Sequence, residues 1–150
     1  MIAEGIFNSK LIYLMPLWGG CELYLIRSLQ VMQNKAARAI TKSGWYTTTE
    51  ELLKQCGWMS VNQLIVYHTL VLVYKVMLNK LPVYLYDKMT PEFTYPTRTW
   101  VHIKDDSESN IRIGPNRDAN HLLTNRSFRW RASKEWNALP VELKQAKSLN

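Results

Sequence analysis

Residues 64–78, LIVYHTLVLVYKVML, are the most apolar stretch of the chain and decide its fold class. Twelve of these fifteen residues are apolar, which is more than one buried face of a helix requires. Ser60 and Gln63 precede the stretch at the spacing of a capping box, and Pro82 cannot continue a helix. We therefore predict a helix from about Ser60 to Asn79 that is buried nearly all round.

Three further helices are predicted on the amino-terminal side of this stretch. Their expected ranges are about Ile2–Leu17, Glu22–Thr41 and Thr48–Cys56. In the second of them, apolar residues recur at steps of three and four and predict one apolar helix face: Leu25, Leu29, Met32, Ala36, Ala39 and Ile40. Gly44 is expected to provide the left-handed cap of that helix, and Thr48 with Glu51 matches a capping box.

The composition changes after Met89, where prolines and an acidic turn interrupt the chain. Residues 101–103 and 111–113 alternate weakly, which favours a short β-hairpin. A final helix is predicted from Ser127 to Ala138, with a last turn at Val141–Leu143 after Pro140. The fold class is thus mainly α, with a helical bundle over residues 1–90 and a less regular extension with a final helix over 91–150.

Length and charge narrow the function classes. The chain of 150 residues has the length of one ordinary domain, and its net charge of +7 fits an anionic partner, nucleic acid before membrane. Two cysteines make no disulfide framework, and the amino terminus lacks a secretory leader, so we expect an intracellular protein of the cytoplasm or nucleus. No segment is long and apolar enough to span a membrane.

Residues that could carry catalysis or bind a metal are sparse. The three histidines lie far apart, no cysteine has a partner at ligand spacing, and no phosphate-binding loop or hydrolase motif occurs. His68 lies in the most apolar helix and is expected to be a hydrogen-bonded core residue. We therefore expect no enzyme activity from this chain by itself, no metal or other cofactor, and no small-molecule substrate.

Two basic clusters are candidates for nucleic-acid binding. The first lies on the helix over 22–41, on the side opposite its apolar residues: Arg27, Asn34, Lys35, Arg38 and Lys42. Cations along a helix can follow a phosphate backbone, although a solvated helix face has the same composition. The second interleaves arginine with aromatic residues: Arg126, Arg129, Trp130 and Arg131. Arginine and aromatic rings can hold phosphates and unstacked bases, whereas aromatic residues that fill a core give the same pattern.

Several sequence motifs occur together in this chain. The longest is residues 29–40, LQVMQNKAARAI. The others follow the order PLWG at 16–19, CGWMSV at 56–61, YH at 67–68, YKV at 74–76, LPVYL at 81–85, TR at 97–98, RSFRWRA at 126–132 and WNALP at 136–140. Together they resemble the region downstream of the polymerase domain in reverse transcriptases of non-LTR retrotransposons of the jockey and CR1 types. Trp130 stands where that family has tyrosine.

The resemblance implies a role in an RNA-directed DNA polymerase that copies element RNA at a nicked chromosomal target. This region would be thumb-like over residues 1–90 and would help to grip the template and primer. The family's fingers and palm, with the aspartates that hold two metal ions, have no counterpart here. Asp105 and Asp106 superficially match the family's active-site turn but lie downstream of the thumb-like helix, so we interpret them as a solvated turn.

The sequence therefore favours a non-catalytic, nucleic-acid-binding C-terminal fragment of such a polymerase. Its partners would be RNA and DNA, contacted through the template-primer backbone together with the upstream polymerase domain. The alternative is a helical protein-interaction module or a non-functional remnant of a transposable element. Salt dependence distinguishes the nucleic-acid-binding fragment from the protein-interaction module, because phosphate binding weakens steeply with salt and an apolar interface does not.

Overall fold

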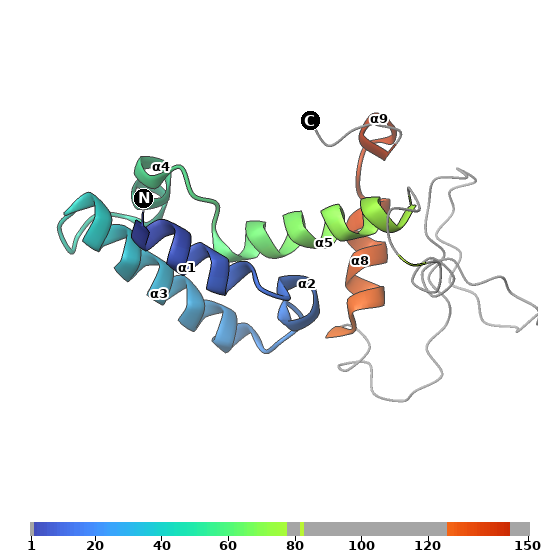
Figure 1. Cartoon of the computed structure of the whole chain (residues 1–150), viewed down its shortest axis with the longest axis horizontal. Coiled ribbons are helices and arrows are strands. Elements are labelled where there is room, and N and C mark those ends of the chain that lie inside the picture. Colours follow the sequence, from blue (N-terminus) through green and yellow to red (C-terminus); the bar gives the residue numbers. More distant parts are fainter. Residues whose placement is uncertain (1, 78–81, 83–125, 145–150) are drawn as a thin grey trace, which may run out of the picture. The chain divides into compact units, whose positions relative to one another are not determined.

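A computed structural model describes residues 2–77, 82 and 126–144 of the chain. Within these residues the protein is mainly α, as predicted, and contains helices without strands (Figure 1). The helices are α1 (Ile2–Ile12), α2 (Met15–Trp18), α3 (Leu23–Thr41), α4 (Thr49–Cys56), α5 (Val61–Met77), α8 (Phe128–Asn137) and α9 (Val141–Lys144). The predicted hairpin, the turn at Asp105–Asp106 and the boundary near residue 90 all lie outside the described residues.

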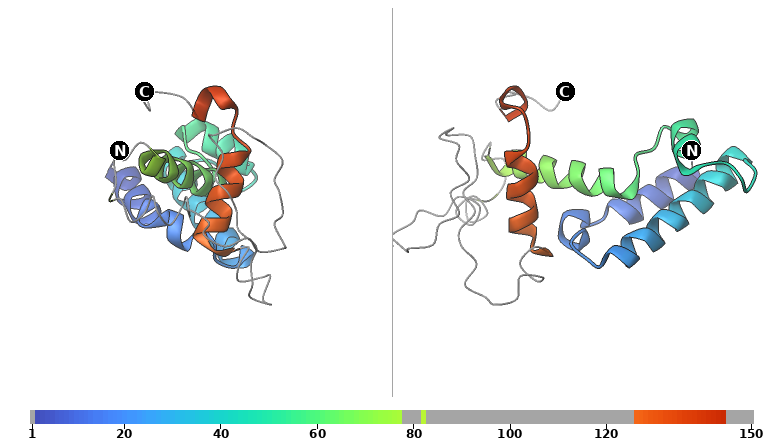
Figure 2. Two further views of the ribbon diagram at one scale, coloured as in Figure 1. Left: turned by 90° about the vertical axis from the view of Figure 1, so that its right-hand side faces the viewer. Right: turned by 180° about the vertical axis from the view of Figure 1, so that it is seen from behind.

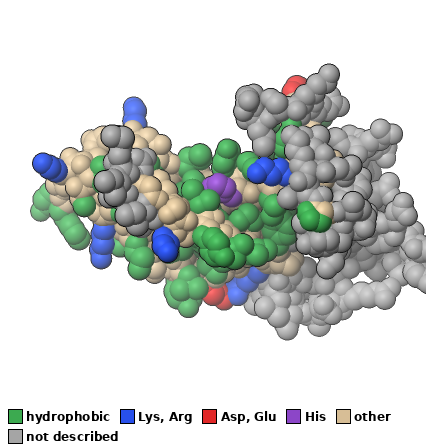
Figure 3. Space-filling model, viewed as in Figure 1, with side chains coloured by type: hydrophobic (Ala, Val, Ile, Leu, Met, Phe, Trp, Pro, Cys, Tyr) green, Lys and Arg blue, Asp and Glu red, His purple; other side chains and the backbone are tan. Residues whose placement is uncertain are grey.

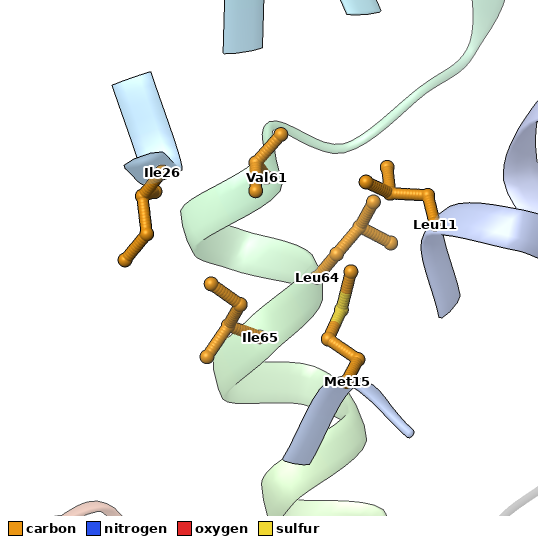
Figure 4. Close-up of a cluster of buried hydrophobic side chains, with 6 residues drawn as sticks. All are labelled: Leu11, Met15, Ile26, Val61, Leu64 and Ile65. Carbon is orange, nitrogen blue, oxygen red and sulfur yellow. The ribbon is translucent and has the colours of Figure 1, made fainter. Parts of the chain in front are cut away.

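The chain forms two compact units, Met1–His68 and Thr69–Asn150. In the first unit, α1 and α3 run side by side in opposite directions, and α4 follows α3 at its carboxyl end (Figures 1 and 2). The core of this unit is a cluster of six buried side chains contributed by α1, α2, α3 and the start of α5: Leu11, Met15, Ile26, Val61, Leu64 and Ile65 (Figure 4). These helices therefore enclose a common apolar core.

The single helix predicted over residues 2–17 is wrong, since the structure divides it into α1 and α2. Leu14 lies between them with a left-handed φ of 50°, and Pro16 occupies the first turn of α2. A continuous helix would press the Pro16 ring against the carbonyl of Ile12 and would leave that carbonyl without a donor. Tyr13, Leu14 and Leu17, which surround the break, are exposed.

The buried face of α3 also differs from the prediction. Its buried residues are Ile26, Gln33, Asn34 and Ala37. Most of the apolar residues predicted to form one face lie elsewhere: Leu25, Met32 and Ile40 are 41%, 56% and 40% exposed. The helix thus turns a partly polar face to the interior and leaves much of its apolar stripe on the surface.

The predicted amino-terminal caps of α4 and α5 are confirmed. The Thr48 hydroxyl accepts from the Glu51 amide at 3.3 Å, and the Glu51 carboxylate accepts from the Thr48 amide at 3.1 Å. Ser60 and Gln63 make the same reciprocal pair, at 3.3 Å and 2.9 Å. Each pair satisfies amide donors that the first helical turn leaves unpaired.

The end of α4 agrees with the predicted range, whereas the cap of α3 differs from the prediction. Gly57 ends α4 with a φ of +66°, and the next amide, that of Trp58, donates to the Leu53 carbonyl at 2.8 Å. This is the left-handed cap that glycine adopts without strain. At the end of α3, however, the left-handed residue is Lys42 and not Gly44.

The second unit contains the later turns of α5, together with α8 and α9. Its core consists of Val73, Tyr74, Val76, Ala132 and Trp136. Ser127 caps α8 by accepting from the Trp130 amide at 3.3 Å, so the predicted final helix is confirmed to within a residue at each end. Along α5, Tyr67 and Lys75 are exposed, so this helix is less completely buried than predicted.

Candidate nucleic-acid interface on helix α3

A network of side-chain amides holds α3 against the turn between α4 and α5. Gln33 is fully buried, and its Nε2 donates to the Met59 carbonyl at 2.9 Å. Gln30 accepts from the Val61 amide at 2.9 Å, and its Nε2 donates to Gln33 at 2.8 Å. Buried amide groups are tolerated because they are paired in this way. The network therefore fixes the rotation of α3 about its axis.

Asn34 belongs to the same network, and the prediction that it shares the exposed cationic face is wrong. Its side-chain oxygen accepts from Gln30 at 2.9 Å, and its Nδ2 donates to the Thr49 hydroxyl at 2.8 Å. The residue is 9% exposed. Its amide links α3 to the first turn of α4, so we assign Asn34 a structural role. Spacings of three and four residues among Gln30, Gln33 and Asn34 were the one sequence signal for this network.

Three cations of the first cluster remain on the surface of α3 or at its end. Arg27, Lys35 and Lys42 are exposed. At 100° per residue they fall within an arc of about 80°, and at 1.5 Å per residue they extend over about 22 Å of helix axis. The helix itself contains no acidic residue. Figure 3 shows Lys and Arg side chains at one end of the first unit, where α4 and the carboxyl end of α3 lie.

Arg38 lies in the same arc but is half-buried. Its guanidinium carbon lies 5.4 Å from the ring centroid of Trp45, and its Nη2 donates to the Thr47 carbonyl at 3.3 Å. Arg38 therefore binds the loop between α3 and α4 to the helix, and its charge is attracted to the face of the indole ring. Its guanidinium is held in place by these contacts, whereas Arg27, Lys35 and Lys42 are exposed to solvent.

Two residues of that loop were missed by the sequence analysis. Trp45 is 77% exposed and Tyr46 is 97% exposed. Composition gave no signal, because a tryptophan and a tyrosine beside a glycine equally fit a buried turn. Their exposure depends on the direction in which the loop leaves α3, which the Arg38 contacts determine.

The described residues of the second predicted cluster are half-buried in the structure. Of the neighbouring aromatic residues, Trp136 is buried in the core of the second unit and Phe128 packs against that core. Trp130 is half-buried, as are Arg126 and Arg131, and Arg131 Nε donates to the Arg126 carbonyl at 3.4 Å. The side chain of Arg129 lies outside the described residues. The one described aromatic residue of this cluster is thus only partly exposed, and α3 is the better-exposed site.

Groups suited to other chemistries are scattered over the same described residues. No three side chains of the metal-binding types come together there. Cys21 and Cys56 are both reduced and half-buried. His68 is half-buried and lies edge-on to the Tyr67 ring at 5.2 Å. No single described helix is long and apolar enough to cross a membrane, and α4 and α5 meet that criterion only as a pair bent by 51°.

Comparisons with known proteins add no family to this description. Neither the protein-family models, nor the curated proteins, nor the solved structures gave a match to this chain.

Proposed function

We propose that the chain binds the backbone of nucleic acid through the exposed face of α3. The observation that supports this most directly is the row of exposed cations, Arg27, Lys35 and Lys42, along a helix without acidic residues. Phosphates are regularly spaced along a nucleic-acid strand, so cations spread over about 22 Å can each reach one. Because the buried amide network fixes the helix, these cations are presented together.

The proposal extends to the parent protein named by the resemblance. The chain would be a non-catalytic part of a non-LTR retrotransposon reverse transcriptase, and α3 would contact the template-primer duplex beside the polymerase domain. Backbone contacts position such a duplex without reading its sequence. The proposal uses contacts to the backbone alone, so we expect RNA–DNA hybrid, duplex DNA and single strands all to bind.

The test is the salt dependence of binding by a charge-reversed variant. The variant carries Arg27→Glu, Lys35→Glu and Lys42→Glu, and leaves Arg38 in place because it holds the loop. Log affinity falls linearly with log salt, and each phosphate that the protein no longer neutralises should make this line shallower by about one unit of slope. We therefore expect the steepness to decrease by about two to three units. Fluorescence anisotropy with a labelled hybrid measures it between about 50 and 200 mM salt.

A matched control has the same change of charge at exposed lysines on other helices: Lys10→Glu, Lys54→Glu and Lys75→Glu. The control should keep most of the slope of the parent, since it removes charge without removing the cations of α3. If the two variants lose affinity equally, binding is a diffuse effect of net charge and the assignment to α3 is refuted. Helix content, followed by circular dichroism, should be unchanged in both.

One observation favours the alternative of a protein-interaction module. Beside the cations, the exposed surface of α3 carries Leu25, Met32 and Ile40. Exposed apolar residues in a helical row are typical of a face that packs on a partner. Binding through this face would change little with salt, and Met32→Glu would abolish it while leaving nucleic-acid binding intact.

A further inference from the structure

The loop between α3 and α4 displays its two aromatic rings to an unusual degree. Trp45 and Tyr46 are 77% and 97% exposed, whereas tryptophan in folded proteins is on average highly buried. Both rings therefore present faces that another flat molecule can cover. Figure 2 shows the loop at the end of the first unit, where α3 passes to α4.

Hydrogen bonds hold this loop in a defined conformation. The Thr47 amide donates to the Gly44 carbonyl at 3.3 Å, which closes a turn around the two aromatic residues. The Ser43 hydroxyl lies 2.7 Å from the Thr41 hydroxyl and 3.1 Å from Gln55 Oε1 on α4, so its one proton is donated to one of these two acceptors. The capping box at Thr48 fixes the other end of the loop. The rings are thus displayed by an ordered turn, so that little freedom is lost when a ligand covers them.

The Trp45 ring is oriented as well as exposed. The Arg38 guanidinium lies 5.4 Å from its centroid and occupies one face. With 77% of the residue exposed, the remainder of the ring is open to solvent. The face of the indole opposite Arg38 is therefore the one on which an unpaired base can stack.

The charges around the loop favour an anionic ligand. Residues 42–49, KSGWYTTT, contain one cation and no acidic residue, and Lys35 and Arg38 lie on the adjoining turns of α3. Glu50 and Glu51 follow in the first turn of α4, and the Glu51 carboxylate is engaged by the Thr48 amide. A single-stranded nucleic acid matches this combination, because its unpaired bases are flat and its phosphates are negatively charged.

We propose that Trp45 and Tyr46 stack on unpaired bases of single-stranded nucleic acid whose phosphates lie along the cationic face of α3. This inference rests on the proposed backbone binding and adds a preference to it: single strands bind more tightly than duplexes, because paired bases are already stacked on one another and offer no free faces. Stacking uses the faces of the bases, so the preference is independent of sequence.

The experiment compares four labelled ligands of twelve nucleotides with the full chain: oligo-dT, oligo-rU, an abasic strand of equal charge, and a DNA duplex. The parent should bind oligo-dT or oligo-rU at least about fivefold more tightly than the abasic strand, the lower bound for stacking on one ring. Tighter binding of oligo-rU identifies RNA as the preferred strand, and tighter binding of oligo-dT identifies DNA. Either order supports the proposal.

Variants then assign the preference to the two rings. Trp45→Ala with Tyr46→Ala should bring oligo-dT to the affinity of the abasic strand and leave the abasic strand unaffected. Tyr46→Ala alone should lose at least about fivefold without disturbing the fold, since its side chain is 97% exposed. Tyr13→Ala is the matched control, because that side chain is 72% exposed and only its backbone carbonyl accepts a bond from the Trp18 indole.

The outcomes separate this inference from the proposed function. If the parent binds the abasic strand and oligo-dT equally, backbone binding stands and stacking is refuted. If the aromatic variants weaken both ligands to the same extent, the loop acts through structure or charge, and stacking is again refuted. If the parent binds none of the four ligands, both proposals fail together.

Discussion

Replacement of Gln33 by alanine tests whether the buried amides hold the first unit together. Gln33 is fully buried, and its Nε2 is 2.9 Å from the Met59 carbonyl. Without it that carbonyl loses a donor, which costs about 1–3 kcal/mol when the group stays away from water. Gln30 loses its bond to Gln33 but keeps the one to Asn34, so this second loss is about 0.5–1 kcal/mol.

Packing adds to these losses and side-chain entropy offsets part of them. The missing methylene contributes about 0.8 kcal/mol, and alanine recovers about 1 kcal/mol or more of the rotamer entropy that a buried glutamine gives up. We therefore expect Gln33→Ala to lower the free energy of unfolding by about 1–4 kcal/mol. Urea denaturation followed by far-ultraviolet circular dichroism measures the change.

Gln55→Ala is the matched control, since it removes the same side chain from an exposed position on α4, where the amide oxygen lies 3.1 Å from the Ser43 hydroxyl. It should change the free energy of unfolding by no more than about 0.5 kcal/mol. A Gln33→Ala variant as stable as the Gln55→Ala variant would show that the network contributes no net stability, and that the rotation of α3 is fixed by other contacts.

Substitutions at three further positions test the close approach at Gly19, the glycine in α1 and the cap of α4. A Cβ at Gly19 would lie 2.6 Å from Cγ2 of Ile65 and 2.9 Å from the Met15 carbonyl oxygen, so Gly19→Ala should destabilise the unit by about 1–3 kcal/mol in urea denaturation. A Cβ at Gly5, inside α1, would have no neighbouring atom within 4 Å. Gly5→Ala should therefore stabilise the first unit by about 0.5–1 kcal/mol. Thr48→Ala should cost about 0.5–2 kcal/mol by leaving the Glu51 amide without its acceptor, and Thr48→Ser should recover most of that loss.

The ends of the helices were largely predictable because they depend on local chemistry. Thr48 with Glu51 and Ser60 with Gln63 satisfy nearby amide donors whatever the rest of the chain does. Gly57 ends α4 in the left-handed conformation, which glycine adopts without strain. The break at Leu14 follows from Pro16 and could have been inferred from the same rules.

The buried face of α3 was not predictable from hydrophobic periodicity. An apolar stripe shows that one side of a helix avoids water, but it does not show which side the neighbouring helices cover. Here the side-chain amides of α3 find their partners on α4 and just after it. The Met59 carbonyl and the Thr49 hydroxyl accept hydrogen bonds from them, and the Val61 amide donates one. These partners come from 15 to 31 residues away, so the pairing is a tertiary property and single-sequence patterns do not contain it.

The correction at Asn34 also changes what the motifs of this sequence mean. In the longest motif, residues 29–40, Gln30, Gln33 and Asn34 all make internal hydrogen bonds. Gly19, in another motif, is needed for the contact with Ile65. These residues specify how the helices pack, and a protein could share them for its fold without sharing a ligand.

The residues that carry the proposed binding are mostly different ones. Arg27, Lys42, Trp45 and Tyr46 lie outside the motifs, and Lys35 is the one exposed cation of α3 inside the longest of them. Fold and binding are therefore separable by mutation in this chain. Substitutions at the buried amides should lower stability and reduce binding only as the unit unfolds, whereas substitutions at the exposed cations and rings should reduce binding at full stability.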